Sequence, residues 1–240
     1  MNRESDWQDS DLSDVQTLER PPAPHSVHRP GAAEAGATVP IRSLSRAHAE
    51  IIARHLLSLS PEDRYLRFGY AATDEHVLRY VERLNFERDE LLGIFNRRLE
   101  LIAMAHLAFS ADARCLSCAE FGVSVLRSAR GRGYGSQLFE RAVVHARNEG
   151  VQMLFIHALS ENTAMLRIAR KAGATIERDG PESEAHLRLP PADFDSRMSE
   201  MLDRQVALTD YHLKAQARIF WRLISGLQSL PQDVMRRIRA

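Results

Sequence analysis

The chain has 240 residues, enough for one domain with a full hydrophobic core and some extensions. Its 32 Lys and Arg residues balance its 32 Asp and Glu residues, so no overall charge favours nucleic acid or a membrane surface as a partner. No apolar run approaches the roughly 20 residues of a membrane span, and no signal-like segment opens the chain. We therefore expect a soluble, cytoplasmic protein with neither nucleic-acid nor membrane partners.

Three regions are expected along the chain. Residues 1–37 are acidic at first and then rich in proline, alanine and glycine, so they have little apolar surface to bury and are predicted to be a disordered tail. A folded domain is expected over 38–191. An amphipathic helical extension is expected over 192–240.

The first part of the domain is predicted to contain helices followed by an antiparallel meander. Apolar residues at helical spacing and a helix-start signal at Ser60-Pro61 indicate the helices, and three apolar runs with short polar connections indicate the strands. In chain order we expect a strand at 39–44, helices at 46–58, at 61–68 and from 73, and strands at 90–96, 101–109 and 118–126.

The second part alternates between the two kinds of element, which is typical of a βαβα unit. It begins with a helix that runs to about Gly150. A strand at 151–159, a helix at 161–172 and short strands at 174–178 and 184–189 complete the expected order.

A glycine-rich loop, RGRGYG at 130–135, lies between a predicted strand and a predicted helix. Glycines let the backbone turn tightly and approach a ligand, and the free amides at the start of a helix favour a diphosphate. The dinucleotide fingerprint would need a third glycine where Ser136 stands, and the chain has no GK[ST] phosphate loop. A nicotinamide or ATP site is therefore disfavoured.

This loop resembles the acyl-CoA-binding signature of the GNAT superfamily of N-acetyltransferases, [QR]-x-x-G-x-[GA], with Arg130, Gly133 and Gly135 in the defining places. The segments on both sides resemble the same family. The stretch SLSPEDRYLRFG at 58–69 is similar to a segment of bacterial protein-acetylating GNAT domains. The resemblance covers roughly residues 39–190.

The resemblance implies an α/β fold with a mixed, α+β-type sheet, the GNAT-like acyl-CoA N-acyltransferase fold. It also implies transfer of an acetyl group from acetyl-CoA to a primary amine, with a protein lysine favoured as the acceptor. A small-molecule amine and a catalytically silent acyl-CoA-binding regulatory module are the alternatives. The residues that it places against acetyl-CoA are Val123, Val125, Leu126, Arg130, Gly131, Arg132, Gly133, Tyr134, Gly135, Ser136 and Asn162.

Glu120 is the candidate general base. On a strand it would share a face with Gly122 and Ser124, a small-residue surface that leaves room for a ligand. A lysine amine has a pKa near ~10.4, so a base must remove a proton before the nitrogen can attack a thioester. The alternative is a solvated carboxylate near a sheet edge.

Asn162 follows the predicted strand at 151–159, where the family commonly keeps an asparagine near the reacting thioester, so we count it as catalytic as well as CoA-binding. A plain helix N-cap is an equally good account of this residue. Seven residues later, Ala169 stands where many GNAT enzymes have a tyrosine that protonates the leaving thiolate. The general acid is therefore missing or supplied elsewhere.

No metal site is expected. Cys115 and Cys118 have metal-ligand spacing, but a closed zinc site needs four ligands and the chain has no second cysteine pair. We interpret the two as buried thiols.

The region from Asp193 to Leu230 has a long amphipathic pattern whose apolar stripe needs a cover. The domain itself or a second copy of the chain are the two main candidates, so a homodimer through this helix is one expectation. An interfacial membrane helix is the weaker alternative, because acidic residues interrupt its polar face.

Overall fold

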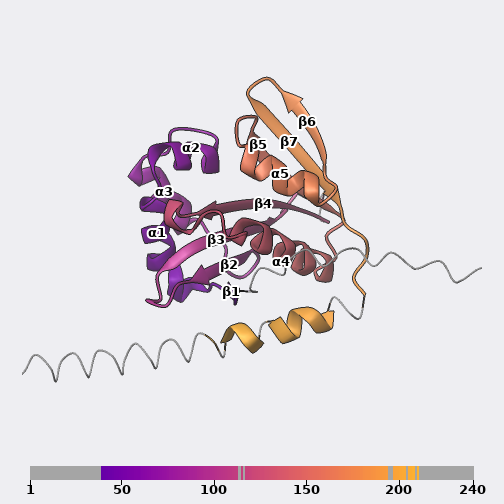
Figure 1. The fold of residues 1–240 in the computed structure, drawn as a ribbon. Coiled ribbons are helices and arrows are strands. Elements are labelled where there is room, and N and C mark those ends of the chain that lie inside the picture. Colours follow the sequence, from indigo (N-terminus) through magenta and orange to yellow (C-terminus); the bar gives the residue numbers. More distant parts are fainter. Residues whose placement is uncertain are drawn as a thin grey trace, which may run out of the picture. The chain divides into compact units, whose positions relative to one another are not determined.

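A computed structural model describes residues 39–112, 115, 117–193, 197–203, 205–208 and 210. The predicted tail, 1–37, and the end of the predicted C-terminal helix lie outside these residues. The described strands form one mixed sheet in the order β1-β2-β3-β4-β5-β7-β6 (Figure 1). The elements are β1 Arg42–Ser43, α1 Ala49–Leu57, α2 Pro61–Phe68, α3 Asp74–Glu82, β2 Glu90–Phe95, β3 Leu101–Phe109, β4 Cys118–Val125, α4 Tyr134–Asn148, β5 Met153–Leu159, α5 Thr163–Lys171, β6 Thr175–Asp179 and β7 Glu182–Arg188.

These bounds confirm the predicted order of helices and strands. The Ser60 side chain accepts a hydrogen bond from the Asp63 amide, Pro61 occupies the first turn of α2, and Gly69 ends the helix in the left-handed conformation. Strands β2, β3 and β4 form the expected antiparallel meander. The local signals that start and stop α2 therefore determine where this helix ends, and its end lies at the candidate site.

Two hydrophobic clusters cover the two faces of the sheet. On one face, α4 and α5 pack against alternate residues of β3, β4 and β5, with Phe121 and Phe139 in edge-to-face contact. On the other face, α1 and α3 pack against β2 and β3, around Ile52 and Met104. This second helical layer covers the strands before β5.

Strands β4 and β5 pair over only three residues. The parallel ladder runs from Cys118 opposite Met153 to Glu120 opposite Phe155 and then stops, although both strands continue. Figure 1 shows β5, β7 and β6 inclined away from β4 beyond this point. A wedge-shaped opening therefore begins at Glu120, bounded by the rest of β4 on one side and by the β5–β7–β6 unit on the other.

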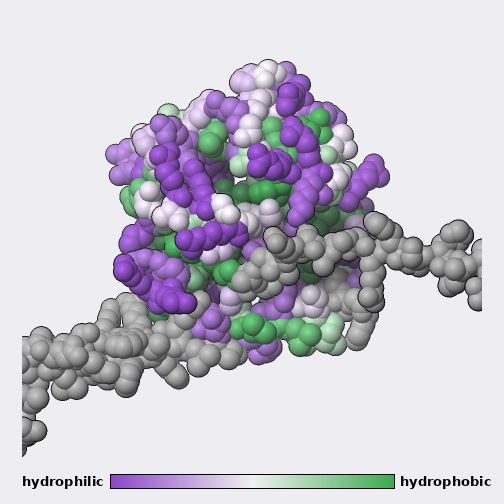
Figure 2. Space-filling model, viewed as in Figure 1, coloured by the Kyte–Doolittle hydropathy of each residue, from purple (hydrophilic) through white to green (hydrophobic). Residues whose placement is uncertain are grey.

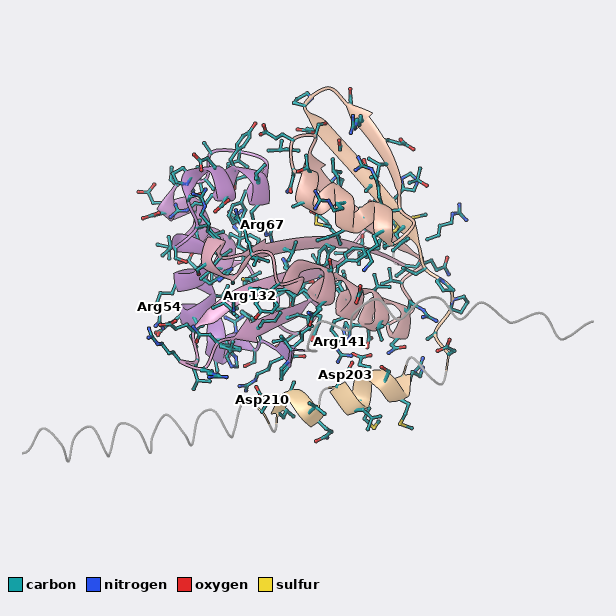
Figure 3. The ribbon with its side chains drawn as sticks, in the orientation of Figure 1. Arg54, Arg67, Arg132, Arg141, Asp203 and Asp210 are labelled. Atoms are coloured by element: carbon teal, nitrogen blue, oxygen red, sulfur yellow. A yellow bond between two sulfur atoms is a disulfide. The ribbon has the colours of Figure 1, made fainter. Side chains whose placement is uncertain are left out.

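Residues 197–203, 205–208 and 210 are helical and contact α4 through a polar cluster. The Glu200 carboxylate accepts hydrogen bonds from His145 and Asn148, and Arg141 lies 3.7 Å from both Glu200 and Asp203 (Figure 3). The sequence left two candidates for packing against this segment, the domain itself and a second copy of the chain. The structure shows a contact with the domain itself. The contact uses charge, while most of the apolar side chains of the segment face outward.

The outward residues of this segment are visible as a hydrophobic strip in Figure 2; they are Met198, Met201, Leu202, Val206 and Leu208. None of the described helices is both long and apolar enough to cross a bilayer.

One expectation was wrong. Cys115 and Cys118 were predicted to be thiols, but the structure joins them in a disulfide. The turn before β4 brings their Cα atoms to 5.4 Å, within the usual range for a disulfide, and sequence spacing alone does not reveal that approach.

The Glu200 contact predicts how the C-terminal segment responds to pH. Burial opposes the charged carboxylate, but the hydrogen bond from His145 and a second from Asn148 lower the pKa of Glu200 to about 2. Burial also opposes the charge of His145, yet the Glu200 hydrogen bond raises its pKa above 6.5. The charged Glu200 carboxylate contributes its full stabilisation above pH 4.5, and this contribution is lost as the pH falls toward 2. The charged His145 ring contributes its full stabilisation below pH 6.5, and this contribution is lost as the pH rises through the raised pKa of His145.

Protection of residues 197–203 and 205–208 from hydrogen exchange should therefore be greatest between pH 4.5 and 6.5 and should fall on both sides. Glu200→Gln should remove this pH dependence and cost about 1–3 kcal/mol of unfolding free energy, because a buried charged partner is lost. The matched control is Asp203→Asn, at a largely exposed carboxylate with a longer contact. Equal effects of the two variants would contradict this account.

Candidate functional site

The glycine-rich loop forms an open cradle at the start of α4. Gly131 and Gly133 have φ values of 77° and 76°, a left-handed conformation that suits glycine, and Gly133 is the residue before the helix. A Cβ at Gly131 would meet no atom within 4 Å, whereas one at Gly135 would lie 3.2 Å from the Cδ1 of Ile168. The first turn of α4 thus presents its free amides to open space, as a diphosphate requires.

Arg130, the first residue of the signature, is engaged within the protein. Its Nη2 lies 2.6 Å from Oδ1 of Asp63 on α2, and its Nε donates to the carbonyl of Val125. Burial opposes the charged form of Asp63, but the hydrogen bonds from Arg130 and Ser60 hold its pKa below the usual value. Arg130 therefore fastens the loop to β4 and to α2.

A cavity of about 380 Å³ lies over this loop and along β4. Except for Leu126 and Arg132, every residue predicted to bind acetyl-CoA lines it: Val123, Val125, Arg130, Gly131, Gly133, Tyr134, Gly135, Ser136 and Asn162. The Leu126 amide instead bonds to Ile102, and Arg132 is exposed at the tip of the loop (Figure 3). Sequence reasoning missed Leu59, Asp63 and Arg167 in this cavity, since no spacing rule connects them with the loop.

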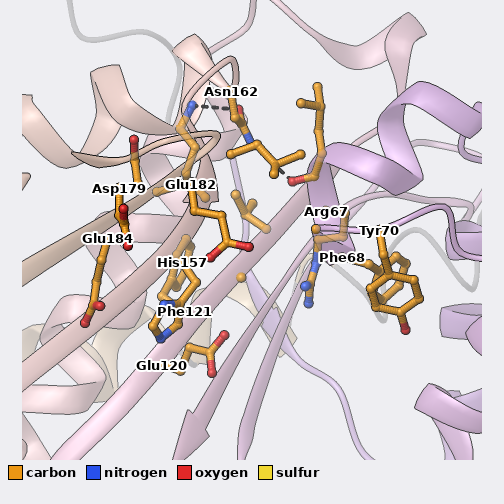
Figure 4. A pocket seen from close by; sticks show the side chains of 18 of the residues that line it. Arg67, Phe68, Tyr70, Glu120, Phe121, His157, Asn162, Asp179, Glu182 and Glu184 are labelled. Atoms are coloured by element: carbon orange, nitrogen blue, oxygen red, sulfur yellow. Dashed lines mark hydrogen bonds between the residues drawn. The ribbon is translucent and has the colours of Figure 1, made fainter. Parts of the chain in front are cut away.

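A larger cavity of about 740 Å³ occupies the wedge between β4 and the outer strands. Figure 2 shows hydrophobic residues at the floor of a hollow with a hydrophilic rim. In Figure 4, Glu120, His157, Glu182 and Glu184 come from one side, and Arg67, Phe68 and Tyr70 from the end of α2 on the other. The predicted base, Glu120, is exposed and lines this cavity.

The two cavities share part of their walls, namely Leu66, Arg67, Val123, Asn162 and Met165. At this junction Asn162 caps α5, because its Oδ1 accepts a hydrogen bond from the Met165 amide, and its Nδ2 donates to the Leu66 carbonyl (Figure 4). The prediction that Asn162 is a helix N-cap is confirmed, and the same side chain borders both cavities. A reacting group held here would be accessible from both sides.

Arg67 lies directly over β4 at the junction. A Cβ at Gly122 would be 2.7 Å from the Arg67 Cζ, so only glycine leaves room for the guanidinium. The group also stacks near Phe68 and Tyr80, with Cζ 5.2 and 5.5 Å from the ring centroids. Among the described residues, no carboxylate forms an ion pair with it.

Carboxylates dominate the outer wall of the larger cavity. In the β6–β7 ladder Glu177 lies opposite Glu184, and Asp179 lies opposite Glu182. Directly opposed like charges destabilise a sheet. With Glu120 at the inner end, this wall attracts a cationic ligand.

Ala169 is fully buried on the core-facing side of α5, and the position that the family often fills with tyrosine lines neither cavity. Sequence reasoning also missed Arg67 and Tyr80, which reach the site from α2 and α3. For Arg67 the sequence did hold an indication, because this residue lies within the segment 58–69 that resembles a family segment. In the described part of the chain, no three potential metal ligands cluster.

The Acetyltransferase (GNAT) family model matches residues 55–174, half of the chain. Solved structures with the same fold include the GNAT domain of S. lividans PAT, at 23% identity and a TM-score of 0.53 over 62% of this chain and 89% of that one. An N-acetyltransferase from Staphylococcus aureus Mu50 has 17% identity and a TM-score of 0.51 over 62% and 98%. A GNAT-family acetyltransferase from Streptococcus pneumoniae also has 17% identity and a TM-score of 0.51 over 62% and 98%.

The cradle predicts the effect of Gly133→Asp. The variant places a carboxylate where the loop backbone must meet a diphosphate, so calorimetry should detect no acetyl-CoA binding. Gly150→Asp is the matched control, because Gly150 has a similar φ of 83° at the other end of α4, away from both cavities. Both variants carry the same backbone strain, and unchanged acetyl-CoA affinity in a folded Gly133→Asp protein would mean that the loop is only a turn.

Proposed function

Because the chain belongs to the GNAT acetyltransferase family, we propose that it transfers an acetyl group from acetyl-CoA to a primary amine, and that this amine is a protein lysine. The observation that carries the proposal is the pair of cavities that meet at Val123 and Asn162. One has the glycine cradle and strand backbone that suit CoA, and the other has the carboxylates that suit a cationic amine. Both substrates can therefore meet at the junction.

The glycine cradle fits the diphosphate of acetyl-CoA, because the left-handed turns at Gly131 and Gly133 leave open space before the amides of α4. Val123 to Leu126 lie beyond the end of the β4–β5 ladder, so the edge of β4 is free to pair with the pantetheine amides. When bound, acetyl-CoA supplies an acyl thioester. Asn162 would orient that group at the junction.

Glu120 serves as the general base in this proposal. Its carboxylate takes a proton from the ammonium group, directly or through one water, and the neutral nitrogen then attacks the thioester carbon. The carbon–sulfur bond breaks as the new carbon–nitrogen bond forms, and CoA leaves as the thiolate. The exposed position of Glu120 lets the proton pass to solvent. The β6–β7 carboxylates attract the cationic acceptor and leave Glu120 to act on the amine.

The choice of a protein lysine is supported by the resemblance of residues 58–69 to protein-acetylating GNAT domains. A small-molecule amine, such as a polyamine, fits the same carboxylates and is the second candidate. A silent acyl-CoA-binding module is favoured by Ala169 and opposed by Glu120 in the larger cavity. A panel of amines and a lysine-containing protein extract, offered with acetyl-CoA, separates the three.

A cytoplasmic location stays a prediction, and so does a homodimer through the C-terminal helix.

Glu120→Gln tests the base. The variant keeps the shape of the side chain but removes its proton acceptor, so turnover at neutral pH should fall about 10²- to 10⁴-fold while acetyl-CoA affinity holds. Raising the pH should restore part of the rate, because more of the amine is then deprotonated in solution. Glu87→Gln, which lies outside both cavities, is the control. Turnover of the Glu120→Gln variant at the parent rate across the pH range would make Glu120 structural.

Glu184→Gln tests the charged wall. Removing one of two opposed carboxylates should raise KM for a lysine acceptor severalfold with little change in kcat, and the difference should shrink at high salt. The same variant should be slightly more stable than the parent, because the repulsion from Glu177 is relieved. An unchanged KM at low salt would show that the wall does not contact the acceptor.

A further inference from the structure

A partly buried series of hydrogen bonds leads away from the larger cavity. It begins at Tyr80 of α3, a residue of the cavity wall, whose Oη lies 2.7 Å from Nδ1 of His106. The other ring nitrogen of His106, Nε2, lies 3.1 Å from Oδ2 of Asp89. The Nη2 group of Arg67 donates to the same Tyr80 oxygen over 2.9 Å. The cavity is thus connected to a half-buried imidazole through one hydroxyl group.

The hydrogen-bond series ends at the carboxylate of Asp89, which is held in the charged form. Burial opposes the charge of Asp89, but hydrogen bonds from Arg88 and His106 keep its pKa below the usual value. Its Oδ1 also accepts hydrogen bonds from the Phe109 amide and from Nε of Arg88. The Asp89 side chain is only 3% exposed, so these partners, and no bulk solvent, set its state.

The directions of the hydrogen bonds follow from the two ends. A carboxylate only accepts, so Nε2 of His106 must carry the ring proton and Nδ1 must present a lone pair. Tyr80 must therefore donate its hydroxyl proton to Nδ1. Burial raises the pKa of Tyr80, so the phenol keeps that proton in the resting state. Since Arg67 only donates, it uses one lone pair of the Tyr80 oxygen, and one lone pair remains.

With its proton directed at His106, Tyr80 faces the cavity as an acceptor, and it does not replace the missing general acid. We propose that Tyr80 is a second proton acceptor for the amine, and that it acts by passing its own proton to His106. The inference rests on the proposed acetyl transfer. Glu120 takes the first proton of the ammonium group, and Tyr80 takes the second, which the nitrogen carries once its bond to the acetyl carbon has formed.

The proton balance of this step is complete. The nitrogen–hydrogen bond breaks as the Tyr80 oxygen gains that proton, and the phenolic proton moves to Nδ1 of His106. The imidazolium is then held by the Asp89 carboxylate, as in other His–Asp pairs. After the product leaves, the two transfers reverse and the proton passes from Tyr80 to water in the cavity.

The environment of His106 keeps the imidazole neutral at rest but allows it to accept a proton during the reaction. Burial keeps the pKa of His106 below 6.5, and Arg67 on α2 acts in the same direction. Asp89, just before β2, and Glu120 on β4 act in the opposite direction. His106 lies directly opposite Gly122 in the β3–β4 ladder, which brings it near the acceptor side of β4. The neutral imidazole is therefore available to accept a proton at neutral pH.

Two substitutions test the relay by kinetics. Tyr80→Phe removes the hydroxyl and keeps the ring, and His106→Gln keeps hydrogen-bonding capacity without a basic nitrogen. Each should lower kcat about 10²-fold at pH 7 with acetyl-CoA affinity and melting temperature nearly unchanged. The loss should shrink as the pH rises, and the double variant should be no slower than either single one, because the two residues act as one unit.

Tyr65→Phe is the matched control, since Tyr65 is exposed on α2, lines neither cavity and lies outside the hydrogen-bond chain. It should retain the parent rate. A second readout needs no turnover: ¹⁵N spectra of His106 at neutral pH should show the proton on Nε2.

Four results would overturn the inference. A parent that acetylates amines while Tyr80→Phe matches Tyr65→Phe would remove Tyr80 from the reaction and leave the proposed function intact. A rate loss that is constant with pH, or a ring proton on Nδ1, would make the chain structural. A parent that turns over no amine in the panel would contradict the proposed function, and this inference with it.

Discussion

The parting of β4 and β5 after Glu120 is the feature on which the rest of the site depends. Three paired residues hold the two strands together at one end, and beyond them the strands diverge. This divergence exposes the edge of β4 to a ligand and opens the larger cavity between β4 and the outer strands. A sheet with continuous pairing at this position would have neither.

Two further contacts hold the opening in shape. The Arg130–Asp63 ion pair joins the glycine loop to α2. The Asn162 side-chain amide joins the start of α5 to the Leu66 carbonyl, which is also on α2. Helix α2 thus contacts both sides of the opening. Because its end carries Arg67 to the junction, the position of α2 controls the space at the reacting centre.

Local features of the sequence were sufficient for most of the fold and for the CoA cradle. The Ser60–Pro61 start of α2, the meander at 90–126 and the glycines at 131–135 each depend on neighbours within a few residues, and the structure has all of them. The alternation that puts Glu120 on a different face from Phe121 is equally local. These features can be predicted without tertiary information, because local propensity and backbone geometry determine them.

The acceptor side could not be predicted in the same way. Arg67, Tyr80 and His106 are distant in sequence from Glu120, and only the packing of α2 and α3 on β3 and β4 brings them together. The Cys115–Cys118 disulfide and the Glu200 contact with α4 likewise depend on a close approach that spacing does not encode. Glycine at 122 has a clear role only once the Arg67 guanidinium is seen above it.

The central claim is that CoA and acceptor sites meet at Val123 and Asn162. A crystal structure with acetyl-CoA tests it most directly. The account predicts the diphosphate on the amides of residues 131–136, the pantetheine paired with the edge of β4, and the acetyl carbon at the junction facing Glu120. Acetyl-CoA bound with its thioester away from that junction, or with its diphosphate on another part of the chain, would contradict the account.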